Sequence, residues 1–228
     1  MRMNSTILNT GNIMKNILAF TALAASLISG AAVAGPSAEL KVAGTIKPPA
    51  CQPSFSGGGV ADFGTIPSAS LVVGQHKKLP WKNIPFSITC DAPIKVALKA
   101  TDNRASSAVT SATGSDANFT YGLGTVAGKK VGGYHLGMAA NAVTTDGATP
   151  RLLYSTDGNQ SWTITDGGGQ FAKDRALAWT GASGTMPAAF SNITGAIWIR
   201  VSLEKPENLP LTQDVPLDGS ATLEVLYL

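Results

Sequence analysis

Short runs in which apolar and polar residues alternate recur along the chain from residue 40 onwards. A period of two is typical of β-strands that bury one face. The runs that predict strands are 40–46, 62–66, 84–90, 94–100, 119–124, 131–136, 151–154, 176–179, 197–203 and 221–228. Gly, Pro and small polar residues separate them, and the polar stretch 101–118 predicts a long loop. Strands at this spacing predict an all-β sandwich with Greek-key connections.

The start of the chain has a different pattern. Residues 1–13 are polar and irregular, and Lys15 then precedes an apolar run that ends in Ala-Val-Ala at residue 34. A basic residue, an apolar segment and small terminal residues are typical of a secretory signal peptide. We interpret residues 1–34 as a signal peptide whose natural start is Met14, and we expect export. A membrane anchor is the alternative, although the run is short for one and a Gly-Pro pair follows it.

Cleavage would also change the charge of the protein. Loss of Arg2 and Lys15 lowers the 17 basic residues to 15, against 14 acidic ones, so the remainder is nearly neutral. Basic residues cluster only as the lysine pairs 77–78 and 129–130, which predicts no nucleic-acid partner. The remaining length suits one domain.

Two cysteines remain after the predicted cleavage, Cys51 and Cys90. In an exported protein two cysteines favour a disulfide, here between the first strand and one two or three elements later. A redox or metal-binding pair is the alternative, but a 39-residue separation does not fit the C-x-x-C pattern.

No catalytic constellation is apparent in the sequence. His76 lies in a polar turn and His135 in a predicted strand, and neither has a catalytic or metal-binding motif around it. The stretch 181–184 is one residue short of the G-x-S-x-G nucleophile motif. We therefore expect no catalytic residues, no cofactor and no metal, and we do not expect an enzyme. A secreted glycoside hydrolase remains the less favoured alternative, since paired carboxylates need not share a sequence motif.

Two polar clusters are candidates for surface binding. Asp102 and Arg104 flank Asn103 and could bind a ligand, although such residues also form turns and ion pairs, which is the interpretation we favour. Asp157, with Trp162 five residues later, resembles the Asp-box hairpin of sialidases in a single imperfect copy. We expect Asp157 to stabilise a turn and Trp162 to pack beneath it. Exposed aromatic residues could instead form a lectin-like platform.

Several stretches taken together resemble the subunits of chaperone–usher pili (fimbriae) of Gram-negative bacteria. They are the alternating run 40–46 before Cys51, the pair formed by 62–66 and Phe86-x-Ile88-x-Cys90, and the apolar final strand with penultimate Tyr227. The stretches 102–104, 122–124 and 154–162 are similar to a pilin-like branch known as a domain of unknown function (DUF1120-like). The resemblance covers the mature chain and is best at its two ends.

The resemblance implies an incomplete immunoglobulin-like, pilin-type β-sandwich that a donor strand from another protein completes. It implies a domain at 51–228, preceded at 35–50 by a short extension and first strand. The implied wall of the acceptor groove is formed by Ala221, Leu223, Val225 and Tyr227. The implied donor strand, which would enter the groove of the next subunit, carries Leu40, Val42, Gly44 and Ile46.

We therefore expect a structural or adhesive subunit of a bacterial surface fimbria. The short segment before Leu40 favours a minor or tip-type subunit over the bulk of the shaft. The protein would pass through the periplasm to the cell surface or the extracellular space. Its implied partners are a periplasmic chaperone, an outer-membrane usher, other fimbrial subunits and, for an adhesin, host or surface glycans. The alternative from another class is a secreted carbohydrate-binding, lectin-like module.

Overall fold

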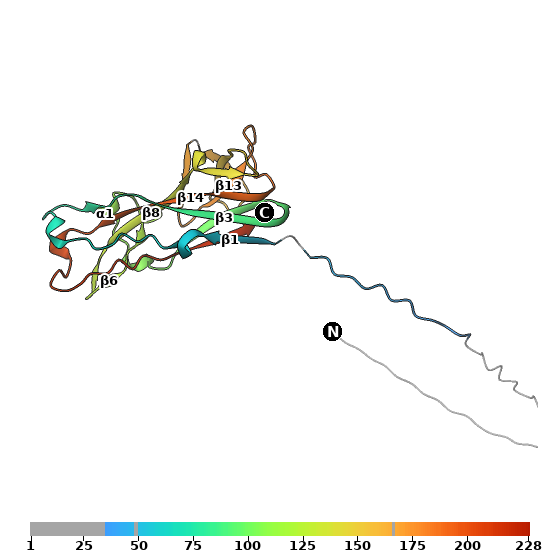
Figure 1. Ribbon diagram of the computed structural model, residues 1–228, viewed down its shortest axis with the longest axis horizontal. Coiled ribbons are helices and arrows are strands. Elements are labelled where there is room, and N and C mark those ends of the chain that lie inside the picture. Colours follow the sequence, from blue (N-terminus) through green and yellow to red (C-terminus); the bar gives the residue numbers. More distant parts are fainter. Residues whose placement is uncertain (1–34, 48–49, 166) are drawn as a thin grey trace, which may run out of the picture. The chain divides into compact units, whose positions relative to one another are not determined.

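The computed structural model describes residues 35–47, 50–165 and 167–228 (Figure 1). Residues 46–228 form one compact unit, and residues 35–45 belong to a separate N-terminal unit. The predicted signal peptide at 1–34 lies outside the described residues. The described residues include no helix long and apolar enough to cross a membrane.

The compact unit is built almost entirely of antiparallel strands, which confirms the predicted all-β class. Its helical elements are single turns: α1 (Thr110–Thr113) and the 3₁₀ turns η1 (Ser56–Gly59), η2 (Ser68–Ser70), η3 (Ala105–Ser107), η4 (Ala140–Ala142) and η5 (Pro206–Asn208). The strands are β1 (Cys51–Phe55), β2 (Lys77–Lys78), β3 (Lys82–Ile94), β4 (Val96–Asp102), β5 (Tyr121–Gly122), β6 (Thr125–Val126), β7 (Lys129–Lys130), β8 (Gly132–Ala139), β9 (Val143–Thr145), β10 (Arg151–Ser155), β11 (Thr163–Thr165), β12 (Gly168–Gln170), β13 (Ala176–Thr180), β14 (Phe190–Leu203) and β15 (Ala221–Tyr227).

The first sheet is organised around β14. Its strand order is β1-β3-β14-β8-β12, with β2, β5 and β9 attached at its margins. One edge of β14 pairs with β3 and β2, and the other pairs with β8 and β9. Pro80 lies in the gap between β2 and β3, since proline cannot donate to the ladder. The fourteen residues of β14 therefore hold together strands that are far apart in sequence.

The second sheet has the order β11-β10-β13-β4-β15. It packs face to face on the first sheet around one core, as expected for a sandwich. Leu98 and Trp179 enter this core from the second sheet, while Ile88, Leu136 and Ile197 enter it from the first, and all five are buried. Burying each of these side chains stabilises the fold by about 1.5–3 kcal/mol.

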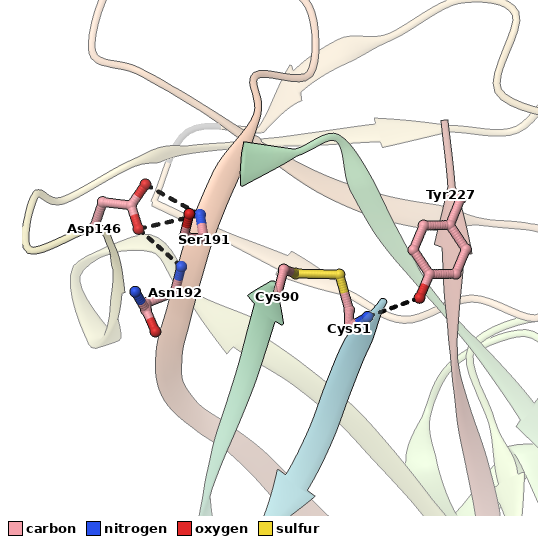
Figure 2. Close-up of a disulfide and its surroundings, with 6 residues drawn as sticks. All are labelled: Cys51, Cys90, Asp146, Ser191, Asn192 and Tyr227. Carbon is pink, nitrogen blue, oxygen red and sulfur yellow. Dashed lines mark hydrogen bonds between the residues drawn. A yellow bond between two sulfur atoms is a disulfide. The ribbon is translucent and has the colours of Figure 1, made fainter. Parts of the chain in front are cut away.

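A bulge bends β14 where it begins. The register between β14 and β3 shifts between Phe190 and Asn192. The carboxylate of Asp146 accepts hydrogen bonds there from the amides of Ser191, at 3.2 Å, and Asn192, at 2.8 Å (Figure 2). The amide of Asp146 in turn donates to the carbonyl of Asn192 at 2.8 Å. The polar groups that the bulge removes from the ladder are therefore satisfied.

Most of the predicted strands are present, and two are not. Strands occur at or close to seven predicted runs, namely 84–90, 94–100, 131–136, 151–154, 176–179, 197–203 and 221–228, and the run 119–124 is reduced to β5. Residues 40–46 and 62–66 form no strand, because within the described part of the chain neither has a backbone ladder to join. The first strand begins instead at Cys51. The predicted loop 101–118 contains η3 and α1.

The predicted disulfide joins Cys51 in β1 to Cys90 in β3 (Figure 2). These residues are direct cross-strand partners whose Cα atoms are 4.0 Å apart. The amide of Asp91 donates to the carbonyl of Ala50, so the cysteines occupy a non-hydrogen-bonded pair, where the side chains of opposite strands come closest. The bond fixes β1 at the edge of the first sheet.

Replacing both cysteines by alanine (C51A and C90A together) should lower the free energy of unfolding by about 4 kcal/mol, because the open chain regains loop entropy across the 39-residue separation. Urea unfolding of the double variant measures this loss, and the chemically reduced wild-type protein is the control. A loss below about 1 kcal/mol in both proteins would contradict the expectation.

Candidate functional site

An open groove runs along one side of the sandwich. It consists of two adjoining cavities of about 390 Å³ and about 1010 Å³, which share Val60, Ala61, Phe63 and Leu217 in their linings. We call it the apolar groove. Its further lining residues from the strands of the two sheets are Phe55, Ile84, Tyr134, Leu136, Ile197, Ile199, Val201, Leu203, Ala221 and Leu223.

The floor of the apolar groove is formed by the inner face of the first sheet. Ile197, Ile199 and Val201 alternate along β14 and project into it, and Leu136 lies beside them on β8. The smaller cavity is lined by apolar side chains and glycines, with Tyr134 as the single residue that carries a polar group. Such a surface favours contact with another apolar surface over contact with water.

One wall of the groove is β15, which pairs with no described strand other than β4. The amide of Asn103 donates to the carbonyl of Ser220, and the amide of Leu228 donates to the carbonyl of Lys95. In an antiparallel pair, every second residue of a strand hydrogen-bonds to the neighbouring strand. These two bonds therefore show that the even-numbered residues of β15 bond to β4. The backbone groups of Ala221, Leu223 and Val225 therefore point away from β4, toward the open edge. Their side chains are half-buried against the core.

The opposite wall is the extended segment 61–66. Phe63 and Ile66 pack against the core, but the segment joins no sheet. Within the described part of the chain, its only backbone hydrogen bond is a local one from the amide of Gly64 to the Asp62 carboxylate at 2.8 Å. The other backbone groups of this segment have no hydrogen-bond partner among the described residues, although the segment lies beside a buried floor.

A third stretch, 211–217, borders the larger cavity. Its lining residues include the apolar Leu211, Val215 and Leu217 and the polar Gln213 and Asp214. The amides of Asp214, Val215 and Leu217 form no hydrogen bond to any described residue. Unpaired backbone edges beside an apolar floor are the features of a sheet that can accept one more strand.

At the disulfide end the gap between the two sheets is closed. The amide of Cys51 donates to the hydroxyl of Tyr227 at 2.9 Å, which ties β1 to β15 (Figure 2). Pro53, the next residue of β1 that faces away from β3, has no amide hydrogen to donate. Tyr227 therefore lies beyond the groove and not in its lining, and its side chain is 53% exposed. Of the other predicted wall residues, Ala221 and Leu223 line the groove, whereas Val225 packs against the core on the same face of β15 and is not in the lining.

The predicted donor residues lie in the described N-terminal segment. Leu40, Val42 and Ile46 are 91%, 96% and 98% exposed, and Gly44 lies between them. The segment contains no helix or strand. A donor role for it stays a prediction.

Asp102 and Arg104 hold internal bonds, as the structural interpretation expected. The buried Asp102 carboxylate lies 3.2 Å from Lys173 Nζ and accepts from the amides of Gly122 and Arg104. The Arg104 guanidinium is 2.9 Å from the Asp218 carboxylate and lowers the pKa of that group. These bonds fix the stretch of chain that leads into β15.

Asp157 and Trp162 belong to the hairpin between β10 and β11. The Asp157 carboxylate accepts from the hydroxyls of Ser155 and Ser161 and from the amides of Gln160 and Ser161. These bonds, those from Ser161 first, hold the pKa of Asp157 well below its usual range. Trp162 is half-buried and packs on a small apolar cluster around Leu153. The predicted turn is confirmed.

No candidate metal site is present in the described ranges, where no group of three or more His, Cys, Asp or Glu side chains could hold an ion. His76 pairs with Glu204 at 3.5 Å, and His135 lies on the outer face of the first sheet. The sequence did not reveal segments 61–66 and 211–217 as walls of the groove. The apolar residues between Pro206 and Pro216 were the available signal.

Comparison with known proteins agrees with the resemblance to the DUF1120-like branch. A family model described as "Protein of unknown function (DUF1120)" matches residues 40–141, which extend from the N-terminal segment through β8. The chain is similar to Protein GltF of Escherichia coli (strain K12), with 26% identity over 245 residues that cover 91% of this chain and 94% of that protein. It is also similar to the Uncharacterized protein YhcF of the same strain, with 27% identity over 236 residues, 89% of this chain and 98% of that protein.

The contact between Cys51 and Tyr227 predicts the effect of a single substitution. Tyr227→Phe should lower the free energy of unfolding by about 0.5–1.5 kcal/mol, since the Cys51 amide loses its acceptor. Tyr154→Phe removes a hydroxyl that accepts no bond from the described residues and should have a smaller effect. Urea unfolding of both variants provides the comparison, and equal effects would contradict the assigned role.

The Asp157 turn predicts a dependence on pH. Because the folded-state pKa of Asp157 lies below its ordinary value, its stabilising effect is complete above about pH 4 and is lost as the pH falls through the folded-state pKa. Asp157→Ala should therefore lower the melting temperature between pH 5 and 7, and the difference from wild type should shrink below pH 4. The exposed Asp214→Ala variant is the control. A difference that stays constant down to pH 2 would argue against this role.

Proposed function

We propose that this protein is an exported subunit of a bacterial surface fimbria, completed by a β-strand from a partner. A periplasmic chaperone would supply the first strand, and the N-terminal segment of another subunit would replace it during assembly. The single observation that carries the proposal is the apolar groove with its unpaired backbone edges.

An added strand would meet two requirements of the groove at once. Its backbone would hydrogen-bond to the open edge of β15, where Ala221, Leu223 and Val225 present their amides and carbonyls. Its alternate side chains would cover the floor around Ile197 and Ile199. Each fully buried Leu, Ile or Val of the incoming strand would contribute about 1.5–3 kcal/mol.

The N-terminal segment has the chemistry of such a strand. Leu40, Val42 and Ile46 recur at even spacing and are almost fully exposed. Seven residues in extended conformation span roughly 23 Å, which matches the seven residues of β15. These features support a donor role in a neighbouring subunit.

The test uses the predicted mature chain, residues 35–228, and a synthetic peptide of residues 37–47. Saturating peptide at about 100 times its dissociation constant should add about 2.7 kcal/mol to the stability. That gain corresponds to an increase of roughly 5–10 °C in melting temperature for a chain of this length. A peptide carrying Val42→Lys should give no shift.

Two variants of the protein localise the effect. Leu223→Lys places a charge in the apolar groove and should abolish the peptide-induced shift, whereas Thr101→Lys, on the outer face of β4, should preserve it. Periplasmic accumulation with a co-expressed fimbrial chaperone is the second measurement, and Leu223→Lys should reduce it. A stable wild-type monomer that responds neither to the peptide nor to the chaperone would overturn the proposal.

A further inference from the structure

The outer face of the first sheet carries a cluster of aromatic and cationic side chains that the groove does not use. Ile197, Ile199 and Val201 of β14 face inward, so Trp198 and Arg200 project from the opposite face. The cross-strand partner of Arg200 on β8 is His135, and Lys78 is the partner of Ser202 on β2. We call Trp81, Trp198, Arg200, His135 and Lys78 the aromatic–cationic platform.

The two indoles and the guanidinium form one surface. The ring centroids of Trp81 and Trp198 are 6.0 Å apart, and the rings are tilted by 35°. The guanidinium carbon of Arg200 lies 4.1 Å from the centroid of Trp81 and 6.0 Å from that of Trp198. Trp81 is 58% exposed, and Arg200 is also exposed. Trp198 is half-buried. A Trp side chain as exposed as Trp81 is unusual for a residue with so much apolar area to bury.

Gly137 allows the indole of Trp198 to pack directly against the backbone of the sheet. Trp198 is the cross-strand partner of Gly137, and a Cβ atom at Gly137 would be 2.4 Å from Cζ2 of the indole. The ring therefore occupies the space that any other side chain would fill. The absence of a side chain at Gly137 gives a broad aromatic surface beside Arg200.

The cations of the platform, Arg200 and Lys78, have no acidic ion-pair partner in the described part of the chain. Burial lowers the pKa of His135, and the nearby Arg200 and Lys78 lower it further. The buried Nε2 of His135 has no hydrogen-bond partner among the described residues. The next acid along this face, Glu204, is already bonded to the Lys205 amide and to Asn208 and lies near His76. The platform thus offers cations to an external anion.

We infer that the platform binds an acidic glycan through a carboxylate-bearing sugar. The faces of Trp81 and Trp198 suit the C–H faces of a pyranose ring, and Arg200 can bind a carboxylate through two hydrogen bonds. Three cationic or titratable groups fit a single carboxylate better than a polyanion such as nucleic acid, because the rest of residues 35–228 carries about as many acidic as basic side chains. The site lies across the sheet from the apolar groove, so the inference does not depend on the proposed function.

The test is titration of the chain 35–228 with trigalacturonic acid, followed by tryptophan fluorescence at two salt concentrations. The matched ligand is the fully methyl-esterified trisaccharide, which keeps the sugar rings and loses the charges. The acid should bind at least tenfold more tightly than the ester, and its affinity should fall with added salt. Equal binding of the two ligands, or none, would overturn the inference.

Variants assign the binding to the platform. Arg200→Gln and Trp81→Ala should each weaken binding at least tenfold, whereas Lys130→Gln, an exposed lysine on β7, should leave it unchanged. Arg200→Lys keeps the charge without the planar donor pair and should give an intermediate loss. Melting temperatures equal to that of wild type exclude unfolding as the cause. If Arg200→Gln destabilises the fold, the binding affinity of Trp81→Ala alone decides whether the ligand binds to the platform.

Two further measurements test whether the platform binds another class of anionic ligand. A sulfated trisaccharide that binds as tightly as trigalacturonic acid would overturn the assignment of a carboxylate sugar. Binding to phosphatidylglycerol vesicles without binding to the trisaccharide would also overturn it, in favour of a lipid surface. Peptide 37–47 in the groove should leave the affinity for trigalacturonic acid unchanged.

Discussion

The pairing of β14 with β3 on one edge and β8 on the other is the interaction on which the rest of the structure depends. This ladder brings together chain segments more than sixty residues apart. It also gives the strand two distinct faces. Ile197, Ile199 and Val201 form the floor of the apolar groove, while Trp198 and Arg200 form the outer platform. Both candidate surfaces therefore depend on one register, because a shift of a single residue would exchange them.

The edge strands β1 and β15 differ in how far their backbone groups are open to pairing. On β1, the disulfide, Pro53 and the bond from Cys51 to Tyr227 leave little that another strand could pair with. On β15 the outward backbone groups are open and lie beside an apolar floor. Open edges are hazardous because they invite aggregation. The open edge of β15 is the edge that the proposed partner strand would occupy.

The similarity to GltF covers 91% of this chain, and the similarity to YhcF covers 89%. The family model ends at residue 141, close to the end of β8. It therefore includes segment 61–66 and Trp81 but not β14 or β15. The function proposed for the groove rests on the geometry of this chain.

The sequence by itself determined the all-β class, most strand positions, the disulfide and the inward face of β15. Alternation with period two and the pairing of two lone cysteines are local or covalent properties, which a pattern can express. Only the tertiary structure decided that residues 40–46 and 62–66 form no strand. It also decided that segments 61–66 and 211–217 border the apolar groove and that Trp81 contacts Arg200. A strand requires a partner edge, and which edges are filled depends on contacts between residues more than a hundred positions apart.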